Sequence, residues 1–122
     1  MKRAIAFSAL LAIYLGSSLA ADAHAQLLKA LPAVGGSVST SPAQLSLKFT
    51  EGIEPGFSGV ELHAADGRLV ETGKASVDPG DQATLIVAVK AKLQPGSYKV
   101  TWHVVSVDTH KTQGSFSFDV KP

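Results

Sequence analysis

Two parts of the sequence carry residue types suited to binding a metal ion. Asp108-Thr109-His110 follows the longest strand candidate, and residues two apart in an extended chain share a face, about 6.6 Å apart along it. A carboxylate and an imidazole could therefore converge on one ion. The second part is His24, near the start of the chain. The sequence has no cysteine and a single methionine at position 1, so metal binding must use nitrogen and oxygen ligands.

Residues 1–23 have the pattern of a secretory signal peptide. A positive start, Met1-Lys2-Arg3, precedes an apolar run over 4–21, and Ala21-Asp22-Ala23 is an A-x-A cleavage signature. A transmembrane anchor is disfavoured because Gly16-Ser17-Ser18 interrupts the apolar run. We therefore expect export, most simply to a bacterial periplasm, and no membrane span in the mature domain, 24–122.

Cleavage after Ala23 would make His24 a chelating group. Its α-amine and ring Nδ1 could bind one metal together, since their ordinary pKa values of about 8 and about 6.5 allow deprotonation near neutral pH. With Asp108 and His110 this gives three nitrogen ligands and one oxygen ligand, a set that suits tetragonal Cu(II). The sequence predicts a site for one Cu(II) ion.

Two other cleavage positions would change this site. Cleavage after Ala21 would leave His24 in third position, in a different Cu(II) chelate that uses backbone amides. Cleavage after Ala25 would remove His24 altogether.

The remaining candidates are weaker. His103 has the opposite strand parity to His110 and lies about 23 Å away in an extended chain, so we expect it on the other face and outside the site. His63 occupies an outward strand position and is interpreted as an exposed histidine. Glu51 follows a strand end beside Gly52, and is either a hydrogen-bond acceptor for a ligand imidazole or a solvated loop acid.

The elements that position these residues are strands. Alternating apolar and polar residues, with turn signals between them and no helical periodicity, predict about seven strands in an antiparallel β-sandwich. In the longest strand candidate, Ser97–Val107, we expect Tyr98, Val100, Trp102 and Val104 to face the core. Residues 31–42 form the longest irregular stretch.

Composition excludes several functions. Residues 24–122 carry nine basic and nine acidic side chains, so a nucleic-acid surface is disfavoured. Without cysteine there are no disulfides, thiolate metal sites or cysteine nucleophiles. The sequence shows no defensible Ser/His/Asp set, no phosphate loop and no second carboxylate beside Asp108 for acid–base chemistry.

From His24 to Val120 the chain resembles the CopC copper-resistance family of periplasmic copper carriers. The block from Trp102 to His110 (WHVVSVDTH) is the most specific part. The other segments that carry the resemblance are His24-Ala25 with Leu27 and Pro32, residues 36–51, Pro95-Gly96-Ser97-Tyr98-Lys99-Val100, and Gly114-Ser115-Phe116-Ser117-Phe118.

The resemblance implies a Greek-key, immunoglobulin-like sandwich that binds Cu(II) through His24, Asp108 and His110. It moves Glu51 towards a position beside the metal ligands or a weak ligand role. Some members have a methionine-rich Cu(I) loop, but residues 61–74 contain no methionine here. Many relatives are fused to, or work with, a CopD-type membrane protein, which makes such a transporter a candidate partner.

We therefore expect a periplasmic protein that binds Cu(II) for buffering, trafficking or resistance, without enzymatic turnover. An N-terminal histidine chelate also occurs in copper-dependent enzymes that cleave polysaccharides oxidatively, although a carboxylate ligand should make redox cycling harder. The third interpretation is a metal-free structural sandwich with incidental histidines.

Overall fold

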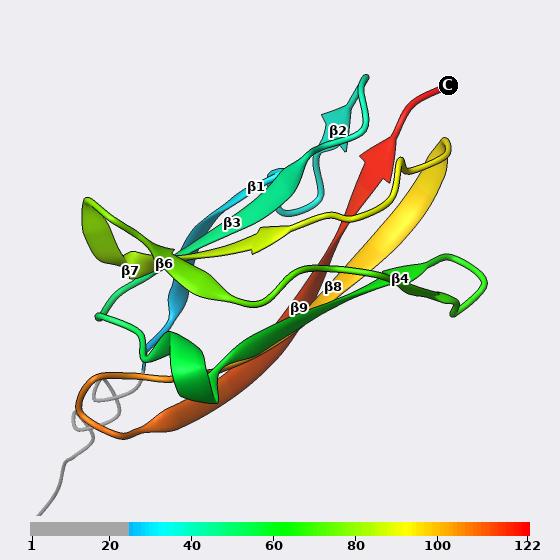
Figure 1. Cartoon of the computed structure of the whole chain (residues 1–122). Coiled ribbons are helices and arrows are strands. Elements are labelled where there is room, and N and C mark those ends of the chain that lie inside the picture. Colours follow the sequence, from blue (N-terminus) through cyan, green and yellow to red (C-terminus); the bar gives the residue numbers. More distant parts are fainter. Residues whose placement is uncertain (1–24) are drawn as a thin grey trace, which may run out of the picture.

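The computed structural model describes residues 25–122, which form two β-sheets packed face to face (Figure 1). The strand orders are β1-β3-β7-β6 in the first sheet and β2-β9-β8-β4-β5 in the second. The strands are β1 (Leu27–Leu31), β2 (Ser37–Val38), β3 (Gln44–Phe49), β4 (Gly59–Ala64), β5 (Leu69–Val70), β6 (Ser76–Asp78), β7 (Asp81–Ala88), β8 (Gly96–Val105) and β9 (Lys111–Val120). Neighbouring strands are antiparallel except β2 and β9, which pair in parallel.

The predicted β-sandwich is confirmed, and the alternation of side chains explains it. Along β8 the buried positions are Tyr98, Val100, Trp102 and Val104, while the residues between them are exposed or half-buried. Strands β3 and β7 of the first sheet contribute the facing apolar residues, and β9 adds apolar residues beside those of β8, so that all belong to one continuous core. Burying one apolar face of each sheet against the other is the main favourable term for such a fold.

Trp102 joins the two sheets. Its indole meets the ring of Phe49 on β3 edge to face, with centroids 5.0 Å apart and an interplanar angle of 73°, an arrangement that aromatic pairs favour. Directly across the β8–β9 ladder lies Gly114, where an added Cβ would be 2.5 Å from Cζ2 of the indole. The core role expected for Trp102 is confirmed, and the position of its indole leaves no room for a Cβ at position 114.

Three details differ from the sequence expectation. The described chain has nine strands rather than about seven, because β2 and β6 have only two or three residues and leave no periodic pattern. Strand β2 lies inside the stretch 31–42 that the sequence marks as irregular. Strand β8 ends at Val105 rather than Val107, so the residues after it begin a turn.

Helical structure in residues 25–122 is limited to η2 (Pro55–Phe57), a single 3-10 turn after β3. None of the described helical structure has the length and apolar character needed to cross a membrane.

The arrangement places the start of the described chain beside the loop between β8 and β9. Figure 1 shows the blue segment before β1 next to the orange loop, with η2 close by and the C-terminus at the opposite end of the sandwich. This end of the sandwich, formed by segments far apart in the sequence, contains the candidate site.

Candidate metal centre

Asp108 and His110 lie in a turn between β8 and β9. The intervening Thr109 has a φ of +71°, which is a genuine outlier for a β-branched residue and costs roughly 1–2 kcal/mol. Such conformations persist where the surrounding structure enforces them, often at functional sites. The extended-chain geometry expected for Asp108 and His110 is therefore wrong. A left-handed residue between them, rather than strand alternation, sets their relative positions.

The turn nevertheless brings the two side chains together. Oδ1 of Asp108 lies 3.2 Å from Nδ1 of His110, and the two side chains are 45% and 43% exposed. A carboxylate oxygen and an imidazole nitrogen thus lie side by side. The Nδ1 atom of His110 is itself buried in this contact, and the exposed part of each side chain is the part that a dissolved ion can reach.

Ser106 holds this turn in place from its buried side. It is fully buried, and its hydroxyl donates a short hydrogen bond to Oδ1 of Asp108 and accepts one from the His110 backbone N–H at 3.3 Å. Its backbone N–H donates to the His110 carbonyl at 2.9 Å, and its carbonyl accepts from Thr109 N–H at 2.8 Å. Both sides of the turn are therefore hydrogen-bonded to one residue.

No role was predicted for Ser106 from the sequence, although the strand pattern contains a signal for one. Ser106 continues the buried parity of Trp102 and Val104, so a small polar residue stands where the pattern predicts an apolar one. A buried hydroxyl requires a hydrogen-bond partner, and this one meets the loop that follows it.

Asp108 is held in its ionised form. The hydrogen bond from the Ser106 hydroxyl, followed by the contact with His110, lowers the pKa of Asp108 from the ordinary 3.8 to about 2. At neutral pH a cation arriving at this carboxylate has no proton to displace.

Glu51 joins the site from the segment after β3. Ile53 forms an antiparallel bridge with Ser106, and Val107 N–H donates to the Gly52 carbonyl at 2.9 Å. One further step in the same antiparallel register, from Gly52 and Val107, places Glu51 opposite Asp108. The Glu51 side chain lies within hydrogen-bonding reach of the Asp108 carboxylate. The residue pattern by itself offered no second carboxylate beside Asp108 for acid–base chemistry, and the structure corrects that expectation; a position of Glu51 beside the ligands is what the family resemblance implied.

The start of the described chain is anchored next to these residues. Ala25 is buried, and its carbonyl accepts a 3.0 Å hydrogen bond from the Thr112 hydroxyl, two residues after His110. Gln26 N–H donates to the Thr50 hydroxyl at 3.0 Å, and Thr50 N–H donates back to the Gln26 carbonyl at 2.9 Å. Thr50 and Thr112 were missed because these contacts join distant parts of the chain. The expected ligand His24 and the expected cleavage point after Ala23 lie outside the described residues.

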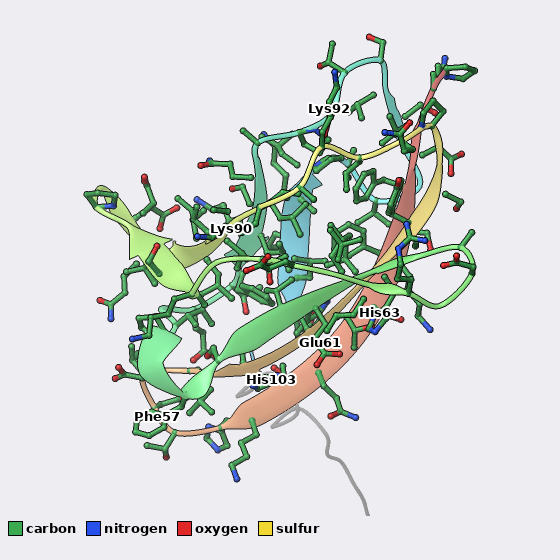
Figure 2. The ribbon with its side chains drawn as sticks, turned by 45° about the vertical axis from the view of Figure 1, so that its right-hand side comes forward. Phe57, Glu61, His63, Lys90, Lys92 and His103 are labelled. Atoms are coloured by element: carbon green, nitrogen blue, oxygen red, sulfur yellow. The ribbon has the colours of Figure 1, made fainter. Side chains whose placement is uncertain are left out.

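His63 and His103 are placed elsewhere, on the outer face of β4 and β8 (Figure 2). Nε2 of His63 lies 3.9 Å from a Glu61 oxygen, and His103 is exposed over Gly59. Within residues 25–122 no group of three or more His, Cys, Asp or Glu side chains is arranged to hold a metal ion. The described part of the candidate centre is thus the Asp108–His110 pair with Glu51 beside it.

Known proteins resemble this chain over most of its length. The model of the CopC domain family matches residues 27–121. Protein YobA of Escherichia coli K12 is 43% identical over 99 residues, covering 81% of this chain and 80% of that protein. Copper resistance protein C of Pseudomonas syringae is 38% identical over 109 residues, covering 85% and 86%. The crystal structure of CopC from Methylosinus trichosporium OB3b superposes with a TM-score of 0.76 at 31% identity, covering 81% of this chain and 95% of that one.

Proposed function

Because the chain belongs to the CopC family of copper resistance proteins, we propose that it binds one Cu(II) ion through Asp108, His110 and His24. The observation that carries the proposal is the Asp108–His110 pair, 3.2 Å apart and half-exposed, beside the anchored residue Ala25. Copper is the cargo of this protein, held for buffering, trafficking or resistance.

The donor set fits Cu(II). Asp108 supplies an ionised carboxylate and His110 an imidazole. Residue 24 precedes the anchored Ala25, and consecutive Cα atoms are 3.8 Å apart, so an amine and imidazole at that position would start close to the turn. The resulting set of three nitrogens and one oxygen suits tetragonal Cu(II). Glu51 would accept a hydrogen bond from a ligand imidazole or bind the ion weakly.

This proposal requires export and cleavage. Residues 1–23 would be removed as a signal peptide, which would leave the domain 24–122 in the periplasm with His24 as its first residue. The intact mass of the exported protein measures the cleavage site directly. A mass that begins after Ala25 would remove the proposed chelate.

We propose a carrier rather than an enzyme. A carboxylate ligand favours Cu(II) over Cu(I), because the reduced ion prefers softer donors, and this slows the redox cycle that an oxidative copper enzyme needs. A CopD-type membrane transporter is the proposed exchange partner. Peroxide production by the copper-loaded protein with a reductant should stay near the level of the metal-free protein. Sustained production that depends on His24 and His110 would support the oxidative enzyme instead.

Titration of variants tests the ligand set. With exported protein of confirmed mass, His24→Ala, Asp108→Asn and His110→Ala should each weaken Cu(II) binding, the two histidine variants by orders of magnitude. His63→Ala and His103→Ala are matched controls that remove an imidazole from the outer sheet face, and they should bind as the wild type does. Electron paramagnetic resonance should show coupling to three nitrogens. Unchanged affinity in His24→Ala or His110→Ala would refute the site.

A further inference from the structure

A groove opens at the end of the sandwich opposite the Asp108–His110 turn. It has a volume of about 690 Å³ and lies between the β2–β3 loop, the segment linking β7 to β8, and the end of β9. Its lining includes Lys90, Lys92 and Lys121 and contains no acidic side chain. Figure 2 shows Lys90 and Lys92 on the segment after β7, away from the end that carries Phe57 and His103.

The backbone around the groove is held by hydrogen bonds between its three walls. Val89 N–H donates to the Ala43 carbonyl at 2.9 Å, and Leu93 N–H donates to the Ser41 hydroxyl at 2.8 Å. Lys121 N–H donates to the Val38 carbonyl at 2.9 Å. The buried side chains of Leu93 and Val120 form part of its lining. The groove is therefore formed in advance, and a ligand need not order its walls.

The groove carries an excess of positive charge, although the described chain as a whole has equal numbers of basic and acidic side chains. Residues 25–122 contain nine basic and nine acidic side chains, yet three of the nine basic ones line this groove. Among the described residues, the ion pairs involve other groups, and none includes Lys90, Lys92 or Lys121. The hydroxyls of Ser39 and Thr40 add hydrogen-bond donors at the same place.

We propose that this groove is a binding site for a phosphate-class oxyanion. Lysine ammonium groups act as mobile point charges that bind phosphate oxygens, and the hydroxyls can donate to the remaining oxygens. The anion can be a soluble phosphate compound or the headgroup of an anionic phospholipid, since both present the same oxygens. Because the lysines are exposed, binding should weaken as salt is added.

Titration with inorganic phosphate, followed by amide NMR shifts of the metal-free protein, tests the site. We expect saturable shifts at residues 90–93 and 121, and their loss in the double variant Lys90→Gln/Lys92→Gln. The control Lys29→Gln/Lys99→Gln removes the same charge from strands β1 and β8 outside the groove, and it should keep the shifts. Absence of saturable shifts, or equal loss in both double variants, would overturn the proposal.

Vesicles distinguish the two sources of the anion. Co-sedimentation with phosphatidylglycerol vesicles, but not with phosphatidylcholine vesicles, that requires Lys90 and Lys92 would assign a lipid headgroup. Phosphate shifts without vesicle binding would assign a soluble phosphate compound. Since copper binding is measured separately at the other end of the sandwich, failure of this site leaves the copper proposal untouched.

Discussion

The hydroxyl of Thr112 donates a 3.0 Å hydrogen bond to the carbonyl of Ala25, a residue 87 positions earlier in the chain. This contact ties the start of the described chain to the first residues of β9, directly after His110. It gives the proposed amino-terminal ligand a fixed point of attachment beside the two ligands in the turn.

Removing that hydroxyl should loosen the proposed site. Thr112→Val keeps the β-branched shape but loses a hydrogen bond worth about 1 kcal/mol, so we expect Cu(II) affinity to fall by roughly 3- to 10-fold. Isothermal titration calorimetry measures this, with Thr101→Val on the exposed face of β8 as the matched control. Wild-type affinity in a folded Thr112→Val protein would contradict the anchoring role.

Ser106 should control both the turn and the acidity of Asp108. In Ser106→Ala, loss of the hydroxyl should raise the pKa of Asp108 from about 2 towards 3.8, and should lower the free energy of unfolding by about 1 kcal/mol. Carboxyl-carbon NMR titration of the metal-free protein reports the pKa. Ser115→Ala on the exposed side of β9 is the control. A pKa of Asp108 that stays near 2 in Ser106→Ala would show that other groups hold it.

Acid should remove a second carboxylate interaction, at Asp81 on β7. Hydrogen bonds from Lys48 and then Thr84 lower the pKa of Asp81 from 3.8 to about 2. Because the folded-state pKa is depressed, the stabilising contribution is present above about pH 4 and is lost as the pH falls towards 2. Asp81→Asn should therefore be less stable than the wild type at pH 6, and the difference should shrink between pH 4 and 2.

Denaturant unfolding at a series of pH values measures that difference. Asp119→Asn on β9 removes the same charge outside this contact and serves as the control. A stability difference for Asp81→Asn that is constant from pH 6 to pH 2 would contradict the linkage.

Adding a side chain at position 114 should lower the stability of the fold. A Cβ there would lie 2.5 Å from the Trp102 indole, so Gly114→Ala should destabilise by about 1–3 kcal/mol through overpacking, a fall of several degrees in Tm for a domain of this size. Gly56→Ala, where a Cβ meets nothing within 4 Å, is the control. Trp102 is the only tryptophan, so its fluorescence also reports the change. Equal melting temperatures for Gly114→Ala and the wild type would show that the indole can move aside.

Much of the fold was predictable from local pattern. Alternation along β3 and β8 identified the buried face, including Val100 and Trp102, because strand side chains point to opposite sides at each step. The short strands β2 and β6 were harder to find, since two or three residues cannot display a period. Strand β2 exists because β9 offers it a pairing edge, which is a tertiary property.

The candidate site, like the fold, was predictable from the sequence only in part. The sequence by itself determined the donor chemistry: histidine and aspartate without cysteine, and Asp108 and His110 two residues apart. Only the tertiary structure decided that a left-handed Thr109 turns these residues towards each other, that buried Ser106 holds them, and that Glu51 and Ala25 arrive beside them. The reason is physical: residue type sets which atoms can bind an ion, whereas the pairing of distant strands sets which of those atoms meet.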